Sequence, residues 1–302
     1  MINQAIASKS IKIYFYVCEK YEDDLQYHCQ RFTNNHLPDF TGQEVMTIYL
    51  FAVHQEKLFG IKQMYSFVKN YFSDWFPKLP SYVAFSTRLN RPSGPFRKLA
   101  GSLLEGFTPG QADREIRLLD SMPIITCSGK RQGKVACELT DKGFCPTKNL
   151  YCYGLKLHVM GFDIDHQTPH PESIVLSKAS ENDLAIFKQD WATTANRTFF
   201  GDKIYNDKGF FDKLGQDKNS FMPTPVKLVK GEPEALRQYD RAFNDLYSKA
   251  VPTVRQPIES LFNRLIEKTD IQRAGKIRST KGLLVHVFGK IAAAFLIPVF
   301  NS

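Results

Sequence analysis

Residues 115–127 read Glu-Ile-Arg-Leu-Leu-Asp-Ser-Met-Pro-Ile-Ile-Thr-Cys, an apolar run that contains one aspartate, Asp120, near its middle. A short run rich in apolar and β-branched residues predicts a β-strand. An ionised carboxylate within such a strand is costly to bury unless it lies at the end of the sheet or meets a cation. Asp120 is therefore either a strand-end residue or a functional one, and the run predicts that this region is built on a sheet.

Three more strand-like runs follow downstream, at residues 149–162, 173–176 and 197–204. A helical pattern returns from Pro257 onward, because proline suits the first turn of a helix and apolar residues then recur at helical spacing. Three or four strands, a helical stretch and a long C-terminal helix together predict an α/β domain with a central mixed sheet.

The part of the chain upstream of residue 110 has a helical pattern. Apolar residues recur at i, i+3, i+4 and i+7 from Ile61 to Phe72, and Thr41 with Glu44 forms a capping-box signature for another helix. Proline- and glycine-containing breakers flank a short helical segment at 96–107. These patterns predict two domains, a helical one at 1–108 and a sheet-based one at 109–302.

The helical domain contains a candidate DNA reader. Ser81 is a predicted N-cap, and a helix that starts after it would use Phe85 and Leu89 for packing while Arg88 and Arg91 project toward DNA. Helix pairs joined by short turns are also common in all-α domains without any DNA role. A helix-turn-helix is thus one of two interpretations of this segment.

The composition is that of an ordinary globular protein with a positive net charge. The 302 residues include 40 Lys and Arg against 31 Asp and Glu, a formal net charge of +9, which indicates either a polyanionic partner such as DNA or a solvated basic face. The six cysteines form no CxxC pair, and His286 and Lys290 interrupt the apolar stretch 282–300. We expect a cytoplasmic protein with reduced thiols, a packed terminal helix and no membrane partner.

Two further carboxylates are candidate partners of Asp120. Asp202 follows the apolar run at 198–200 in a Gly-Asp pair, which is also a common turn. Glu259 borders the apolar face of the predicted helix after Pro257, where a first-turn glutamate would be favoured by the helix dipole alone. Two aspartates at strands and one helical glutamate can nevertheless converge at one edge of a sheet.

Such a set of three carboxylates suits phosphodiester chemistry. Oxygen ligands select hard divalent cations, and two Mg²⁺ ions about 3.5–4 Å apart can activate an attacking oxygen and stabilise a leaving oxygen. In this interpretation Asp120 bridges both ions while Asp202 and Glu259 each bind one. We expect Mn²⁺ to be able to substitute for Mg²⁺.

Four ordered motifs, at residues 118–124, 153–158, 200–205 and 255–259, resemble those of DDE-type bacterial insertion-sequence transposases. The closest similarity is to the family named after insertion sequence 982, and it extends over essentially the whole chain. The resemblance implies an RNase H-like mixed sheet with flanking helices, preceded by an all-α helix-turn-helix-like N-terminal domain. It places Asp120 on the first strand, Asp202 at the end of the fourth and Glu259 on a following helix.

The same resemblance implies an activity and partners. It implies Mg²⁺-dependent cleavage at the ends of an insertion sequence, joining of the freed 3′-hydroxyl to target DNA, and a homodimer acting on DNA near the nucleoid. Two alternatives stay open: an RNase H-like nuclease or resolvase without strand transfer, and a catalytically inactive DNA-binding repressor.

Several basic residues near the motifs are candidate DNA contacts, namely Lys156, His158, Lys203, Arg255, Arg264 and Lys268. Arg255 and Glu259 match part of a Tyr-x₂-Arg-x₃-Glu-x₆-Lys signature of related transposases, but Pro252 and Ile266 stand where its tyrosine and lysine would be. Other polar residues suggest plain structural roles: Asp163, Asp165 and His166 in a hairpin turn, and Glu181 and Asp183 at the start of a helix.

Overall fold

The computed structural model describes residues 4–29, 38–106, 114–163, 168–225, 231 and 233–301. The chain forms two compact units. The helical unit comprises Met1–Gly106, Lys134–Glu138 and Leu265–Ser302, and the sheet unit comprises Phe107–Gly133 and Leu139–Arg264. The first boundary falls next to the predicted division at 108, whereas residues 265–302 group with the N-terminal helices.

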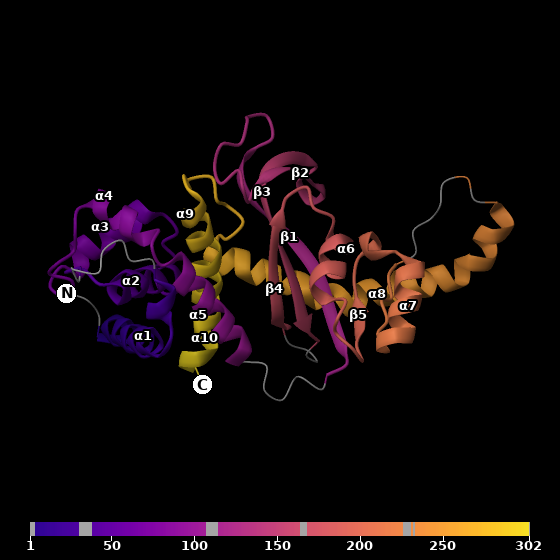
Figure 1. Cartoon of the computed structure of the whole chain (residues 1–302), viewed down its shortest axis with the longest axis horizontal. Helices are drawn as coiled ribbons and strands as arrows, with labels where there is room; N and C mark the ends of the chain where they lie inside the picture. The colour runs from indigo at the N-terminus through magenta and orange to yellow at the C-terminus, as the bar shows by residue number, and fades with distance from the viewer. Residues whose placement is uncertain are drawn as a thin grey trace. The chain divides into compact units, whose positions relative to one another are not determined.

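The sheet unit is built on a β-sheet (Figure 1), which has five strands in the described part of the chain. They are β1 (Ile116–Ser128), β2 (Asp141–Cys145), β3 (Leu150–Phe162), β4 (His170–Lys178) and β5 (Thr198–Phe200). The order β2-β3-β1-β5 forms the main path, and β4 also pairs with β3. Since β3 is antiparallel to β1 while β5 is parallel to it, the sheet is mixed, as predicted.

The predicted strands match β1 and β3 within one residue, while the other two differ in length. The run at 173–176 is the middle of the longer β4, and that at 197–204 shrinks to the three-residue β5. Asp141–Cys145 was not predicted as a strand, because Asp-Lys-Gly-Phe-Cys has neither alternation nor β-branched residues. Its strand character comes from its antiparallel pairing with β3.

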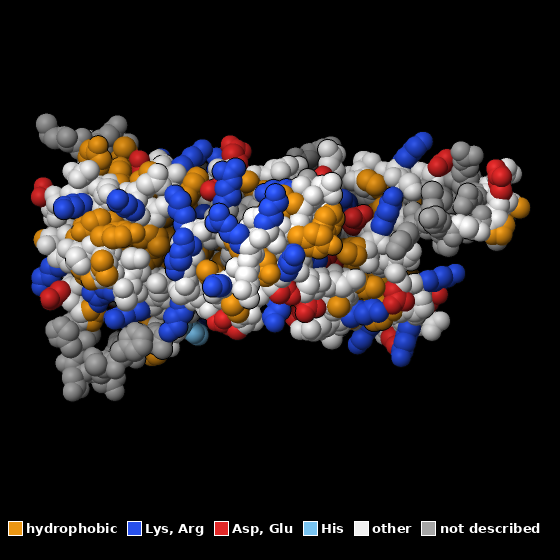
Figure 2. Space-filling model, turned by 90° about the horizontal axis from the view of Figure 1, so that it is seen from above, with side chains coloured by type: hydrophobic (Ala, Val, Ile, Leu, Met, Phe, Trp, Pro, Cys, Tyr) orange, Lys and Arg blue, Asp and Glu red, His pale blue; other side chains and the backbone are white. Residues whose placement is uncertain are grey.

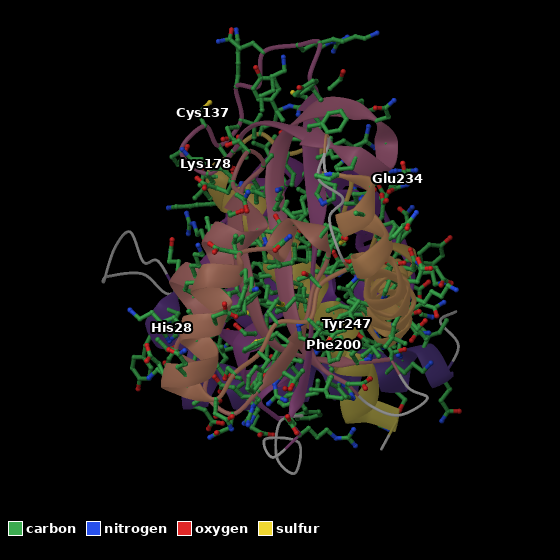
Figure 3. The ribbon with its side chains drawn as sticks, turned by 90° about the vertical axis from the view of Figure 1, so that its right-hand side faces the viewer. His28, Cys137, Lys178, Phe200, Glu234 and Tyr247 are labelled. Carbon is green, nitrogen blue, oxygen red and sulfur yellow. The ribbon has the colours of Figure 1, made fainter. Side chains whose placement is uncertain are left out.

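Among the described residues, the helical segments that accompany the sheet are α6 (Asp183–Ile186), the π-helical turn η3 (Phe187–Trp191), the 3₁₀ turn η4 (Lys203–Tyr205), α7 (Lys208–Lys218) and α8 (Glu234–Thr269). Figures 1 and 3 show α6 and α7 on one side of the strands and α8 on the other. The core on the α6 side is strongly aromatic; its buried members are Leu119, Met160, Phe187, Trp191, Phe199, Tyr205 and Leu214.

The start of the last long helix differs from the prediction. Helix α8 begins at Glu234, so Pro257 lies deep inside the helix rather than in its first turn, as does Pro252. Each proline leaves the carbonyl four residues earlier without its helical N–H partner. Those carbonyls belong to Ser248 and Thr253, which are exposed and so accessible to water. The buried stripe that follows Pro257 is confirmed, since Ile258, Leu261, Phe262 and Leu265 are all buried.

The helical unit contains the remaining elements: α1 (Gln4–Asp23), η1 (Leu25–His28), α2 (Gly42–His54), α3 (Ile61–Tyr71), α4 (Tyr82–Leu89), α5 (Ser93–Gly106), α9 (Thr280–Leu284), the π-helical turn η5 (Val285–Gly289) and α10 (Lys290–Asn301). The capping box is confirmed, because Thr41 Oγ1 accepts from the Glu44 amide at 3.2 Å and Glu44 accepts from the Thr41 amide at 2.5 Å. Helix α2 starts at that cap.

The candidate reader helix α4 has the predicted cap and core face. Ser81 Oγ accepts a hydrogen bond from the Ala84 amide, and Phe85 and Leu89 are buried. Arg88 packs its guanidinium 5.9 Å from the centre of the Phe40 ring, so part of this side chain is used for packing. A short helix pair is present, but a DNA role for it stays a prediction.

The C-terminal helical segment packs within the helical unit. Gly289 of η5 lies against the Tyr49 ring, where an added Cβ would come within 2.5 Å of a ring carbon. Ile291 and Leu296 of α10 are buried. In the described part of the chain, no helix is both long and apolar enough to cross a membrane.

Candidate active site

The first two carboxylates each follow the same registered pair of neighbouring parallel strands, with Asp120 inside β1 and Asp202 just past the end of β5. The last registered pair between β1 and β5 is Leu118 with Phe200, and Asp120 and Asp202 each follow two residues later. Phe200, labelled in Figure 3, marks the end of β5. This register places Asp120 and Asp202 at the same end of the paired segment, where β5 stops and β1 continues.

Arg255 of α8 connects the first carboxylate to the third. Its Nη1 lies 2.9 Å from Asp120 Oδ2, and its Nη2 lies 2.8 Å from Glu259 Oε1. Arg255 and Glu259 are one helical turn apart, the spacing at which opposite charges on a helix attract each other. One guanidinium therefore lies between two of the three predicted site carboxylates.

Burial is the main influence on the charge of Asp120. Desolvation raises the pKa of Asp120 to about 6, against the opposing effects of the Arg255 charge and of the Ser121 amide, which donates to Asp120 Oδ1 at 2.8 Å. The negative charges of Glu259 and Asp183 raise that pKa further. Asp120 is thus a carboxylate for which a nearby cation has a large effect on ionisation.

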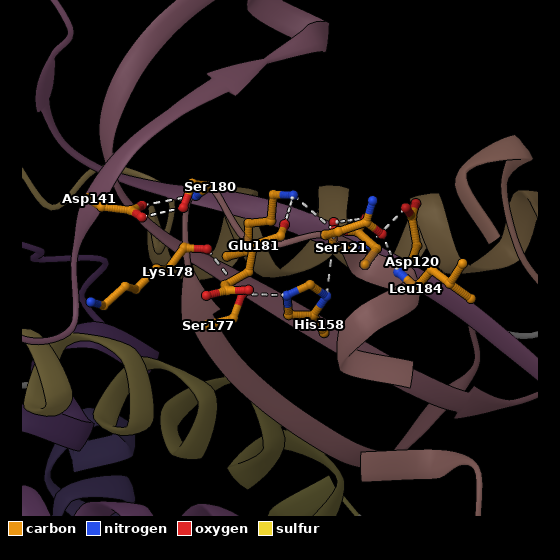
Figure 4. Close-up of polar contacts among 12 residues, drawn as sticks. Asp120, Ser121, Asp141, His158, Ser177, Lys178, Ser180, Glu181 and Leu184 are labelled. Carbon is orange, nitrogen blue, oxygen red and sulfur yellow. Dashed lines mark hydrogen bonds and ion pairs between the residues drawn. The ribbon is translucent and has the colours of Figure 1, made fainter. Parts of the chain in front are cut away.

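Asp183 lies closer to this site than its sequence suggested. It starts α6 after the Asn182 N-cap, as predicted, but its side chain is buried. Asp183 Oδ2 accepts from Ser121 Oγ at 2.8 Å, and its Oδ1 is 2.9 Å from Lys156 Nζ. Figure 4 shows the polar contacts of this region, with Asp120 beside Ser121. The only sequence signal for Asp183 was that two acidic residues, Glu181 and Asp183, stand where a short helix would start. An ordinary helix start gives the same signal, so the sequence did not indicate a role in the site.

Lys156 and His158, two predicted DNA contacts, both face this Asp183 network. Lys156 also donates to the Glu181 carbonyl at 2.7 Å. His158 is fully buried, with Nε2 2.7 Å from Ser177 Oγ and Nδ1 3.9 Å from Asp183 Oδ1. Burial lowers the pKa of His158, so its ring is neutral near pH 7. A DNA contact by His158 would require this network to open.

Tyr205 is a second residue that the sequence analysis did not single out. It ends the 3₁₀ turn that Asp202 caps, and it is 1% exposed. Burial, and then the charges of Asp183 and Asp120, raises the pKa of its phenol well above the usual value. Its ring lies against Gly201, where an added Cβ would come 2.5 Å from a ring carbon, and no spacing in the sequence signals this contact.

The other predicted DNA contacts lie nearer the surface. Lys203 and Arg264 are exposed, and Lys268 is half-buried on α8. Lysine and arginine side chains are spread along the face shown in Figure 2, with acidic side chains between them. Asp165 and His166 lie outside the described residues, while Asp163 directly follows β3.

The side chains of the site offer the oxygen donors that a divalent cation prefers. Carboxylate oxygens are the ligands that Mg²⁺ and Mn²⁺ prefer, and the guanidinium of Arg255 shows that a positive charge is accommodated between Asp120 and Glu259. Among the residues that the structure describes, no three His, Cys, Asp or Glu side chains are gathered closely enough to hold a metal ion. The carboxylate oxygens are ligands of the type that a divalent cation prefers, while Arg255 occupies the position between Asp120 and Glu259.

A mixed sheet with one aspartate on β1, a second just past the end of the parallel strand β5 and a glutamate on a flanking helix is consistent with an RNase H-like domain. The family model described as "Transposase DDE domain" matches residues 111–280, more than half of the chain. The chain belongs to this transposase family. Searches of curated proteins and of solved structures each return no match.

Proposed function

We propose that this transposase cleaves the ends of an insertion sequence and joins the freed 3′-hydroxyl to target DNA, with Asp120, Asp202 and Glu259 as its catalytic carboxylates. The observation that carries the proposal is the register of β1 and β5, which aligns Asp120 with Asp202, together with the Arg255 bridge from Asp120 to Glu259. Both connect residues more than 50 positions apart in the sequence.

These three carboxylates would hold two divalent cations, Mg²⁺ or Mn²⁺, which when bound activate the attacking oxygen and stabilise the leaving one during in-line displacement. The contribution of the chain is to supply oxygen ligands from a rigid strand, a strand end and a helix. Asp120 is the best placed to be shared, because it lies in the middle of β1 and is already within ion-pair distance of a cation.

Arg255 has two roles in this proposal. In the DNA-free protein it neutralises Asp120 and Glu259, which would otherwise repel each other across a partly buried site. When it leaves them it is free to bind a DNA phosphate, because its fork of donors matches phosphate as well as carboxylate. Its position one turn from Glu259 keeps it beside the scissile region in either state.

Basic residues outside the carboxylate set would hold the DNA. Lys203 is adjacent to Asp202, and Arg264 and Lys268 continue along α8 from Glu259. Arg88 and Arg91 at the end of α4 are the proposed contacts of the helical unit with the element ends. Lys156 and His158 would support the site through Asp183, and direct DNA contact by either stays a prediction.

Three finer assignments belong to the same proposal. We infer membership of the group named after insertion sequence 982, action as a homodimer that holds two element ends, and a location in the bacterial cytoplasm at the nucleoid. The ordered motifs of the sequence support the first, and the need to join two ends supports the second. The absence of a membrane-spanning helix among the described residues is compatible with the third.

The test is to incubate the full chain with Mg²⁺ or Mn²⁺, element-end DNA and a target plasmid. Joined products support the proposal, whereas cleavage without joining would indicate a nuclease or resolvase. DNA binding with neither product would indicate an inactive repressor. The family match does not favour these alternatives. Imperfect inverted repeats in the DNA that flanks the coding region would identify the ends to use.

A further inference from the structure

Helix α1 has an exposed apolar patch on its outer face. The helix lies at the edge of the helical unit beside α2 (Figure 1), and it buries Ile13 and Val17. On its other side Ile11, Tyr14 and Phe15 are exposed, Phe15 by 67%. Single exposed apolar side chains are ordinary, but three within five positions of one helix form the kind of patch that marks an interaction surface. These three residues are called the α1 patch below.

The charges around the α1 patch differ between its two ends. Exposed lysines, Lys9 and Lys12, lie toward the N-terminus of α1. Toward its C-terminus lie three exposed acidic residues, namely Glu19, Glu22 and Asp23. Lys20, which is 2.9 Å from Glu19 and 3.7 Å from Asp23, offsets one of these negative charges.

The stability of α1 itself does not account for this charge order. The helix dipole favours acidic residues at the N-terminus of a helix and basic residues at its C-terminus, which is the reverse of what α1 has. A face that is basic at one end and acidic at the other is instead complementary to a copy of itself turned end for end. The charge order therefore points to a second copy of this chain as the occupant of the α1 patch.

Helical geometry makes the match specific to individual residues. An α-helix turns about 100° and rises about 1.5 Å per residue, so Lys12 and Glu19 lie on the same side of Phe15, about 4.5 and 6 Å from it in opposite directions. Ile11 and Cys18 have the same relation on the other side. A two-fold axis at Phe15 would place Lys12 against Glu19 of the partner subunit, and Ile11 against Cys18 of the partner subunit, each contact occurring twice.

We infer that the α1 patch is the contact between two copies of this chain, which pair through antiparallel α1 helices with Phe15 at the two-fold axis. The inference rests on the proposed function, which needs a dimer to hold two element ends, and it names the surface that forms the dimer. One helix pair is a small interface compared with the roughly 1,200–2,000 Å² of stable complexes. The pairing is therefore weak, and binding to two ends of one DNA reinforces it.

Disulfide trapping in the full chain tests the antiparallel arrangement. Ile11→Cys places a thiol opposite Cys18 of the partner subunit, so mild oxidation should produce a covalent dimer on a non-reducing gel. Within one chain the two positions are about 10.5 Å apart along the helix, too far for a disulfide. Wild type, which has six cysteines, sets the background.

A second variant separates antiparallel from parallel pairing. In Ile11→Cys/Cys18→Ser the covalent dimer should be lost, because the introduced thiol no longer faces a cysteine. Parallel helices would instead bring the introduced thiol against its own copy, and the covalent dimer would persist.

Sedimentation velocity of the DNA-free full chain measures the contribution of the patch. Phe15→Ser should weaken self-association about 10-fold or more, because it removes the aromatic side chain at the centre of the contact. Leu246→Ser, at a side chain of α8 that is 64% exposed, is the matched control and should leave self-association unchanged.

Charge reversal supplies a test that a general loss of folding could not imitate. Lys12→Glu and Glu19→Lys should each weaken self-association about 3- to 10-fold, because each places like charges across the axis. The double variant Lys12→Glu/Glu19→Lys should recover wild-type self-association, since opposite charges face each other again. Failure of the double variant to recover would contradict the Lys12–Glu19 contact.

Three further outcomes would overturn the inference. Ile11→Cys could give no covalent dimer above background, with or without element-end DNA. The covalent dimer could persist in Ile11→Cys/Cys18→Ser, or Phe15→Ser could associate as strongly as wild type. In each case wild type that still joins element ends to target DNA would keep the proposed function. Loss of cleavage and joining in wild type would refute that function alone, since the trapping assay needs no catalysis.

Discussion

Two regions of the molecule bury basic side chains, and they provide different partners for them. In the sheet unit, Arg255 lies between the carboxylates of Asp120 and Glu259. In the helical unit, His286 Nε2 donates to the Ile271 carbonyl at 2.8 Å, and Lys290 Nζ donates to the Asp270 carbonyl at 3.1 Å. The first region pairs full charges, whereas the second uses backbone oxygens.

The difference between carboxylate and backbone partners distinguishes the candidate active site from a purely structural feature. Side-chain carboxylates keep their charge when a cation is exchanged, so Arg255 can be replaced by a metal ion or be drawn to a phosphate. Backbone carbonyls offer only partial charge, and burial accordingly lowers the pKa of Lys290 to about 7 and that of His286 to about 3. A buried basic side chain alone therefore does not indicate a functional site, whereas a carboxylate partner that keeps the side chain charged does.

The largest expected effect comes from removing a carboxylate of the site. Asp120→Asn, Asp202→Asn and Glu259→Gln should each reduce DNA cleavage on the order of 1,000-fold or more, because each removes several kcal/mol of charge stabilisation from the transition state. Gel assays of cleavage and of binding on element-end DNA check this. Binding should be retained, and near-normal cleavage in any variant would exclude that residue from the site.

Removing the cation between the carboxylates tests the first half of the comparison. Arg255→Gln should destabilise the metal-free protein by about 1–3 kcal/mol, since it leaves Asp120 partly buried and unpaired. It should also bind Mn²⁺ more tightly than wild type, because the guanidinium no longer competes. Urea unfolding and Mn²⁺ titration measure the two effects.

Arg264→Gln, at an exposed arginine of the same helix, is the control for Arg255. It should leave both the stability and the Mn²⁺ affinity unchanged. Weaker Mn²⁺ binding by Arg255→Gln would contradict the competition between guanidinium and metal.

Titration of Lys290 tests the second half of the comparison. Its folded pKa of about 7 lies below the unfolded value of 10.5, so between these pH values the unfolded chain binds more protons than the folded one. The free energy of unfolding should therefore rise with pH across that window, by about 2–4 kcal/mol from this residue. In Lys290→Met that rise should be lost, as measured by urea unfolding from pH 7 to 10. An unchanged slope would mean that Lys290 is charged in the folded state.

The smallest effects are expected for two arginines of the helical unit that lie outside both of the compared clusters, Arg88 and Arg91. Arg88→Gln and Arg91→Gln should each lower the affinity for element-end DNA about 2- to 10-fold and reduce the salt dependence of binding by about one unit of slope, with little effect on folding. Fluorescence anisotropy at several salt concentrations measures both quantities. Unchanged affinity in both variants would exclude α4 as the reader.

The sequence predicted the elements whose signals are local. The capping box at Thr41, the cap at Ser81 and the long runs of β1 and β3 all lie within a few residues of their causes. The start of α8 was misplaced because Pro257 is typical of a first turn, and its prolines are tolerated only where water can reach the freed carbonyls.

The residues of the candidate site also divide into those that sequence signals predicted and those that they did not. The three carboxylates could be proposed from charge placed in apolar runs and from the ordered motifs, and their roles stay predictions. Asp183 and Tyr205 were not predicted, because their proximity to Asp120 depends on how α6 and η4 pack against β1. No spacing rule along the chain encodes that packing.

The membership of the helical unit has a consequence for how the protein is made. Its core combines α2 and α5 with η5 and α10, so residues on both sides of the sheet unit must be present before it is complete. During synthesis on the ribosome, the apolar faces of the N-terminal helices therefore stay uncovered until the sheet unit and the C-terminal helices after it have been made. A premature stop after α8 would spare every proposed catalytic carboxylate and still leave the first unit unfinished.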